Sequence, residues 1–174
     1  MVALEPLLAA FSELKWHIKA NSCLNTKAMQ VAASEKDGEA LFMVAESPWM
    51  DGLTEAYAHQ QQAAVNHVSI HTRTLDSLAA ELGLKRIDLV KIDVERAESK
   101  VLLGARDMIC RFQPCFVIDL HTPEQDVAVA QLLTAERYYL ARLVADLRFS
   151  ALMCGWPNPD GVWGTIIASA RGKA

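Results

Sequence analysis

Two apolar segments of the chain, residues 87–92 and 115–118, each end in ionisable residues. The side chains that follow them are Asp93, Glu95, Asp119 and His121. Near-continuous apolar runs of this length are typical of parallel strands covered on both faces. Charges are costly inside such a sheet, and ligands of open α/β sheets bind outside the carboxyl ends of the strands. The sequence therefore predicts a site built from these four side chains.

Asp93 and Glu95 are two carboxylates just past a buried strand. Such a pair can bind a cation, orient an amino group of a cofactor, or act as a base. A surface turn capped by acids, with Glu98 at a helix start, is the alternative. The spacing of His and acidic residues does not form a metal motif, so any cation would depend on the carboxylates of Asp93 and Glu95.

Asp119 and His121 alternate on their strand, so their side chains are expected on the same face. A carboxylate beside an imidazole raises its basicity and fixes its tautomer. The pair is therefore expected to deprotonate a hydroxyl group, with His121 as the base. A strand-end histidine that hydrogen-bonds to the backbone is the alternative. A third apolar segment, residues 2–4, ends in the same way at Glu5.

Composition limits the classes of protein to consider. The chain has 174 residues, 52% of them hydrophobic, with a net charge of -4 and a pI of about 5.7, so we expect one packed domain over residues 1–174. The charge does not favour nucleic-acid binding. Four cysteines without paired spacing indicate reduced thiols and a cytoplasmic location. The sequence shows no apolar run of about 20 residues for a membrane span and no signal peptide.

Hydrophobic periodicity and turn residues predict strands that alternate with helices. Strands are expected at residues 2–5, 27–33, 39–45, 68–72, 87–92, 115–120, 138–144 and 162–169. Helices are expected after Pro6 as far as Asn21, and at residues 75–82, 97–111 and 124–136. Residues 46–66 are expected to form a long loop, and residues 146–160 to be irregular. This alternation predicts βαβ units and an α/β fold with a mostly parallel sheet.

Several short motifs resemble those of the FkbM family of S-adenosylmethionine-dependent O-methyltransferases. They are TLDSL at residues 74–78, IDLVKIDVE at 87–95, AE at 97–98, LGA at 103–105, ALEP at 3–6, VAAS at 31–34 with DG at 37–38, and the strand from Pro114 to His121. The similarity covers residues 2–122, and the KIDVE block between TLDSL and GA is its most specific part. The resemblance implies a Rossmann-like class I methyltransferase sheet.

The resemblance also implies a cofactor, S-adenosylmethionine, and residues that would bind it. Glu5 would accept hydrogen bonds from the ribose hydroxyls, and Ala32 and Ser34 would flank the adenine ring. Asp93 would position the cofactor or the acceptor. The implied reaction is O-methylation of a hydroxyl on a small molecule or glycan, with His121 as the base and Asp119 supporting it.

The chain departs from the family pattern in two ways. Arg96 stands where the family usually has glycine, and no glycine-rich D-x-G-A-x-x-G segment precedes Glu5. In the family that segment forms the first strand and helix. The chain is therefore expected to be an N-terminally truncated, partial methyltransferase domain. Its strands at residues 2–5 and 87–92 would have unpaired edges, which are expected to pair directly, to form a homodimer, or to aggregate.

Two other functions compete with methyl transfer. A truncated chain would be an inactive remnant, or a non-enzymatic α/β interaction domain that borrows a strand from a partner. A hydrolase with Asp93, Glu95 and Asp119 as metal ligands ranks last, because the spacing does not match a metal motif.

Overall fold

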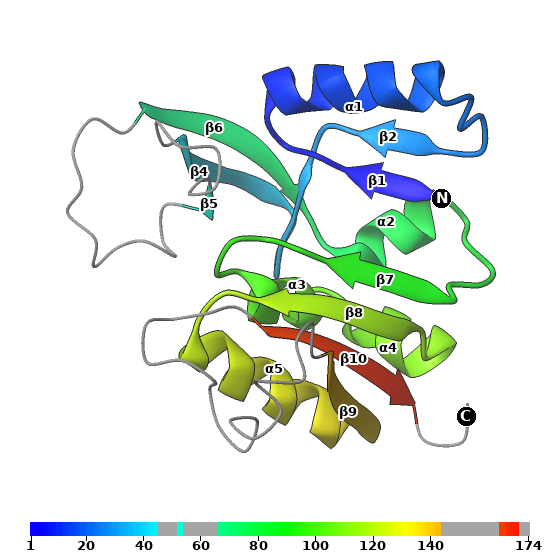
Figure 1. Ribbon diagram of the computed structural model, residues 1–174, viewed down its shortest axis with the longest axis vertical. Helices are drawn as coiled ribbons and strands as arrows, with labels where there is room; N and C mark the ends of the chain where they lie inside the picture. Colours follow the sequence, from blue (N-terminus) through cyan, green and yellow to red (C-terminus); the bar gives the residue numbers. More distant parts are fainter. Residues whose placement is uncertain (45–51, 54–65, 144–163, 171–174) are drawn as a thin grey trace.

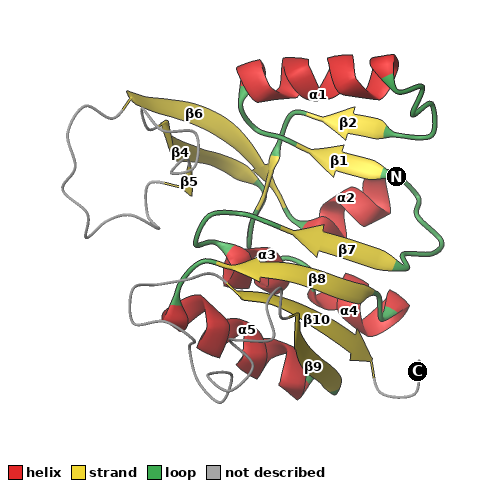
Figure 2. Ribbon diagram, in the orientation of Figure 1, coloured by secondary structure: helices red, strands yellow, loops and turns green. Residues whose placement is uncertain are grey.

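The computed structural model describes residues 1–44, 52–53, 66–143 and 164–170, and it has the expected α/β architecture (Figures 1 and 2). The strands are β1 (Val2–Leu4), β2 (Lys27–Met29), β3 (Ala32–Ala33), β4 (Gly38–Val44), β5 (Gly52–Leu53), β6 (Asn66–Arg73), β7 (Leu89–Ile92), β8 (Cys115–Leu120), β9 (Tyr138–Leu143) and β10 (Gly164–Ala170). The helices are α1 (Leu8–Ala20), α2 (Leu75–Glu81), α3 (Glu98–Leu103), α4 (Arg106–Phe112) and α5 (Pro123–Ala135).

The described strands form three sheets, with strand orders β1-β2, β7-β8-β10-β9 and β3-β6-β4-β5. The pairs β1–β2, β7–β8 and β3–β6 are parallel. β10 runs antiparallel to both β8 and β9, and β4 runs antiparallel to both β5 and β6. The prediction of a mostly parallel sheet is therefore wrong for the described strands, because β10 lies between β8 and β9 and β4 folds back on β6. In Figure 1 the arrows of β1, β2, β7 and β8 all point the same way. The chain segments that follow Leu4, Ile92 and Leu120 therefore leave their sheets on the same side, as the sequence predicts.

The main core lies between the β7-β8-β10-β9 sheet and helices α3, α4 and α5. Its residues include Phe116, Ile118 and Leu120 of β8, each 0% exposed. In β8 these buried side chains alternate with partly exposed ones, so one face packs on the helices and the other carries the polar groups described below. On that second face Leu89 of β7 is 59% exposed. We expected β7 to be covered on both faces, but the described residues cover only one of them.

The TLDSL motif contacts the GA motif and the helix that follows it, since Asp76 N–H donates a hydrogen bond to the Gly104 carbonyl at 3.0 Å. Thr74 caps α2, since its side chain accepts a hydrogen bond from Ser77 N–H at 3.0 Å. The carboxylate of Asp76 accepts hydrogen bonds from the backbone N–H groups of Asp107, at 3.1 Å, and Met108, at 2.7 Å, at the start of α4. Asp76 therefore ties α2 to α4, and both motifs have a structural role.

Two predicted elements are interrupted. The helix expected at residues 97–111 is split into α3 and α4 at Gly104 and Ala105, and the strand expected at 27–33 is split into β2 and β3. At the first break Gly104 approaches the Ser34 carbonyl so closely that a Cβ would lie 2.1 Å from its oxygen. The loop prediction for 46–66 and the irregular segment 146–160 fall largely outside the described residues.

The edges of β1 and β7 are unpaired among the described residues. β1 pairs with β2 alone, and β7 pairs with β8 alone, so the two strands do not pair with each other. Helix α1 contributes no buried residue, and Trp16 on it is 63% exposed. Within the described part of the chain, the helices are all too short or too polar to cross a bilayer.

Candidate active site

The centre of the site is His121, the first residue after β8. Its side chain is 6% exposed, and its Nδ1 donates a hydrogen bond to Glu98 at the start of α3, a residue that is 0% exposed. A carboxylate only accepts hydrogen bonds, so this contact places a proton on Nδ1. Glu98 therefore fixes both the tautomer and the orientation of the imidazole ring.

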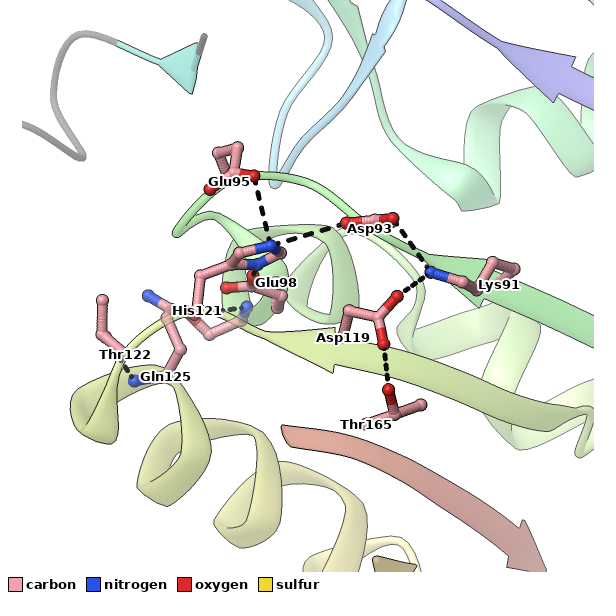
Figure 3. A network of polar contacts seen from close by, with 10 residues as sticks. Lys91, Asp93, Glu95, Glu98, Asp119, His121, Thr122, Gln125 and Thr165 are labelled. Atoms are coloured by element: carbon pink, nitrogen blue, oxygen red, sulfur yellow. Dashed lines mark hydrogen bonds and ion pairs between the residues drawn. The ribbon is translucent and has the colours of Figure 1, made fainter. Parts of the chain in front are cut away.

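The other ring nitrogen of His121 faces two carboxylates from the loop after β7 (Figure 3). Nε2 lies 3.2 Å from Glu95 Oε1 and 3.5 Å from Asp93 Oδ1. The side chain of Glu95 is 24% exposed and that of Asp93 is 56% exposed. The parallel register of β7 with β8, which pairs Ile92 with Ile118, brings this loop alongside the end of β8.

Asp119 belongs to a neighbouring row of polar groups on the open face of the sheet. Its carboxylate accepts hydrogen bonds from Lys91 of β7 and from the hydroxyl of Thr165 of β10. Lys91 Nζ also lies 3.2 Å from Asp93 Oδ2, which links this row to the His121 group. Asp119 was expected to support His121 directly, but the structure gives that contact to Glu98 and pairs Asp119 with Lys91.

The charges around His121 set its protonation. Burial alone would lower the pKa of His121, but the hydrogen bond with Glu98 and the negative charges of Glu98, Glu95 and Asp93 raise it above its usual value. Burial raises the pKa of Glu95, and the charge of His121 opposes that effect. The imidazole is therefore a stronger proton acceptor than an ordinary histidine.

The pair of Lys91 and Asp119 is held in its charged form. Burial would raise the pKa of Asp119, but the hydrogen bonds from Lys91 and Thr165 lower it below its usual value. Burial would lower the pKa of Lys91, and the hydrogen bonds to Asp119 and Asp93 raise it. An ammonium group thus remains beside Asp93 at neutral pH.

The residues expected at the cofactor lie on other elements. Glu5 directly follows β1, and its Oε1 accepts a hydrogen bond from Leu7 N–H at 2.8 Å at the start of α1. Ala32 of β3 is 9% exposed and packs in a small core with Ile70 and Ala97. Ser34 is 5% exposed, and its N–H bonds to the Arg73 carbonyl at 3.0 Å. Their cofactor role stays a prediction.

Sequence reasoning missed three residues of the site: Glu98, Lys91 and Thr165. The sequence pattern marks Glu98 only as an acid at a helix start on the surface, whereas in the structure it begins α3, three residues after Glu95, and is buried. Lys91 and Asp93 are two residues apart, so their side chains are expected on the same face of the strand. This spacing could have identified Lys91 as part of the site. Thr165 reaches Asp119 through the antiparallel register of β10 with β8, which the sequence does not reveal.

Comparisons with known proteins identify the family of the chain. A family model described as the methyltransferase FkbM domain matches residues 1–143. Over 49 residues the chain is 51% identical to the AMB antimetabolite synthetase AmbE of Pseudomonas aeruginosa, which is 28% of this chain and 2% of that protein. Over 44 residues it is 41% identical to the 2-O-methyltransferase NoeI of Sinorhizobium fredii, which is 25% of this chain and 18% of that protein.

A solved structure has the same fold. The crystal structure of methyltransferase FkbM from Methylobacillus flagellatus matches with a TM-score of 0.54 at 16% sequence identity. The match covers 97% of this chain and 36% of that one. The chain thus spans well under half the length of the relatives and the structure that it matches.

Proposed function

Because the chain belongs to the FkbM methyltransferase family, we propose that it transfers a methyl group from S-adenosylmethionine to a hydroxyl oxygen of a small molecule or glycan. The observation that carries this proposal is the imidazole of His121, which Glu98 fixes on one side while Nε2 faces Asp93 and Glu95. An oxygen acceptor is also supported by NoeI, whose name describes a 2-O-methyltransferase.

The carboxylates that follow β1 and β7 suit the hydrogen-bond donors of the cofactor. When bound, S-adenosylmethionine supplies an electrophilic methyl group on a sulfonium. Its ribose hydroxyls and amino group donate hydrogen bonds, and the carboxylates of Glu5 and Asp93 accept them. Both side chains follow parallel strands that end on the same side of the molecule, the usual position of such ligands. Ala32 and Ser34 would flank the adenine ring.

The protein's own part in the reaction is to place and move one proton. As the acceptor oxygen gains a methyl group, its proton passes to Nε2 of His121, and Glu98 stabilises the imidazolium that forms. Asp93 and Glu95 border the same position and orient the acceptor hydroxyl. Lys91 holds Asp93 through its ammonium group, 3.2 Å from Oδ2.

The proposed setting is a single domain in the cytoplasm. Cys23, Cys110 and Cys115 are free thiols in the described part of the chain, which supports a reducing compartment. The family match over residues 1–143 supports our proposal that the 174 residues form one domain.

A methyl-transfer assay with labelled S-adenosylmethionine and a panel of polyols, saccharides and phenols tests the proposal. His121→Ala is expected to lower turnover by roughly 10²–10⁴-fold, because it removes the base. Asp119→Asn is expected to give a smaller loss, since Asp119 contacts Lys91 and Thr165 instead of His121. Asp93→Ala is expected to alter KM as well as kcat.

Two outcomes would contradict the proposal. Label found on carbon, and on no oxygen of any acceptor, would exclude O-methylation. Near-normal turnover of His121→Ala would exclude the imidazole as the base and make Asp93 the better candidate. Circular dichroism of each variant controls for folding.

A further inference from the structure

Asp93, Glu95 and His121 converge on one point in space. Each offers one ligand atom, and these atoms all lie within 4.8 Å of one another. The distances from His121 Nε2 are 3.2 Å to Glu95 and 3.5 Å to Asp93. Ligand atoms bound at about 2.1 Å to a common ion lie roughly 3–4 Å apart. Figure 3 shows the three side chains directed toward one another, so small side-chain movements would place them around one cation.

Glu98 holds His121 as a carboxylate holds the histidine of many metal sites, by accepting a hydrogen bond from the ring nitrogen that does not bind the metal. Its carboxylate takes the proton of Nδ1, which leaves Nε2 with a lone pair on the side of Asp93 and Glu95. Glu98 is 0% exposed, and its second oxygen, Oε2, has no hydrogen-bond partner among the described residues. A buried carboxylate with an oxygen that lacks a hydrogen-bond partner indicates that positive charge is needed close by.

The net charge of the side chains around His121 also favours a bound cation. Its carboxylates are those of Asp93, Glu95, Glu98 and Asp119. Lys91 contacts Asp93 and Asp119, and the charge of Arg96 acts on Glu95. With a neutral His121, two negative charges remain in excess, which is the charge that one divalent cation would balance.

We propose that Asp93, Glu95 and Nε2 of His121 bind one divalent cation of the Mn²⁺ class. One imidazole with two carboxylates is softer than the all-oxygen sites of Mg²⁺ and Ca²⁺ and harder than the Cys and His sites of Zn²⁺. Three protein ligands leave positions open to water and to a hydroxyl group.

The role of the cation rests on the methyl transfer proposed above. An acceptor hydroxyl bound at an open position would have a lowered pKa and would lose its proton to solvent. In the metal-bound protein His121 is then a ligand and no longer the base. The binding of the cation itself does not depend on that reaction.

Titration of the protein with Mn²⁺ alone, followed by calorimetry and by the paramagnetic resonance signal of free Mn²⁺, tests the site. The wild type is expected to bind one Mn²⁺ per chain in the micromolar range. Asp93→Asn, at an exposed position, and His121→Ala are each expected to weaken binding at least tenfold. Glu98→Gln, which removes the carboxylate that holds His121, is expected to weaken Mn²⁺ binding by 10–100-fold.

Asp88→Asn is the matched control, because it removes one exposed carboxylate that pairs with Arg86 before β7, away from this group. Its Mn²⁺ affinity is expected to stay within twofold of the wild type. Equal Mn²⁺ binding by wild type and Asp93→Asn would overturn the cation site, whatever the methyl-transfer assay shows. Mn²⁺ binding that is weakened by both Asp93→Asn and His121→Ala, in a protein without methyl transfer to any acceptor, would support the site and refute the proposed function alone.

Discussion

At the scale of single residues, the structure separates groups that serve chemistry from groups that serve packing. Tyr138 belongs to the second kind. Its hydroxyl is buried without a hydrogen-bond partner among the described residues, burial raises its pKa to about 12, and its ring lies 5.6 Å from that of Phe116. The ring, and not the hydroxyl, is the part that stabilises the fold.

Tyr138→Phe tests this distinction. Removing an unpaired buried hydroxyl is expected to leave the free energy of unfolding unchanged or to raise it by about 1 kcal/mol. Tyr138→Ala removes the ring and is expected to cost about 3–5 kcal/mol. Urea unfolding measures both. A loss above about 1 kcal/mol for Tyr138→Phe would show that the hydroxyl has a partner outside the described residues.

Arg96 illustrates how a departure from a family pattern acquires a physical meaning. Its φ is 62°, in the left-handed region where glycine has no Cβ penalty. The glycine usual in the family at this position is therefore explained by the backbone between Glu95 and Ala97. In this chain an arginine adopts the same conformation, and its charge acts on Glu95.

At the scale of the elements, Gly104 controls how α3, α4 and β3 pack. A Cβ there would lie 2.1 Å from the Ser34 carbonyl oxygen and 3.2 Å from Thr74 Cβ. The first contact is with backbone, which cannot move without disturbing β3. Gly104→Ala is therefore expected to lower the free energy of unfolding by at least about 3 kcal/mol.

Gly164→Ala is the matched control, because a Cβ at Gly164 would meet only the end of the flexible Arg142 side chain, at 3.4 Å. Its effect is expected to stay below about 1 kcal/mol in either direction. Thermal unfolding of the two variants compares them directly. Equal stability of Gly104→Ala and Gly164→Ala would contradict the close approach of Gly104 to Ser34.

Asp37 makes the junction of β4 and α2 sensitive to acid. Its carboxylate accepts hydrogen bonds from Thr74 N–H at 2.6 Å, Ser77 Oγ at 2.9 Å and Arg73 Nε at 3.2 Å. The bond from Thr74 N–H is the main reason that the pKa of Asp37 lies below its usual value. A carboxyl group with a lowered pKa in the folded state contributes stability above its unfolded pKa and loses it as the pH falls through its folded pKa.

Asp37→Asn is therefore expected to be less stable than the wild type near pH 6, with the difference shrinking below about pH 4. Urea unfolding at several pH values measures this difference. Ser77→Ala removes one of the three donors and is expected to give a smaller effect of the same sign. A difference that stays constant from pH 6 to pH 3 would contradict the lowered pKa.

The sequence predicted elements well where local pattern decides, and less well where distant contacts decide. The strand at 115–120 agrees with β8 to the residue, because its apolar run and Pro114 mark both ends. The expected helix at 97–111 is broken, since the break depends on Ser34, some seventy residues earlier. Asp93, Glu95 and His121 meet as predicted, because neighbouring parallel strands end together.

The partners of these residues were less predictable. Glu98 replaces Asp119 as the contact of His121, because the orientation of α3 decides which acid is buried. Asp119 accepts hydrogen bonds from Lys91 and Thr165 instead. The position of Thr165 depends on the pairing of β10 between β8 and β9. Register between strands distant in sequence is set by tertiary packing, which local patterns do not encode.

At the scale of the whole molecule, the edges of β1 and β7 decide how the chain behaves in solution. Among the described residues β1 pairs with β2 alone and β7 with β8 alone. An unpaired edge exposes backbone N–H and C=O groups that can pair with another chain. Apolar side chains accompany these edges, since Val2 is 36% exposed and Leu89 is 59% exposed. A strand from a second copy would pair with these backbone groups and cover these apolar side chains.

We therefore expect the 174-residue chain to self-associate at micromolar concentration, giving dimers or larger species in sedimentation velocity. Leu89→Lys is expected to reduce association, because a charged side chain on an edge strand opposes pairing. Val127→Lys is the control, since Val127 is 55% exposed on α5, away from both edges, and it is expected to associate like the wild type. A wild-type chain that sediments as a monomer at every concentration would show that the edges of β1 and β7 do not recruit a second copy.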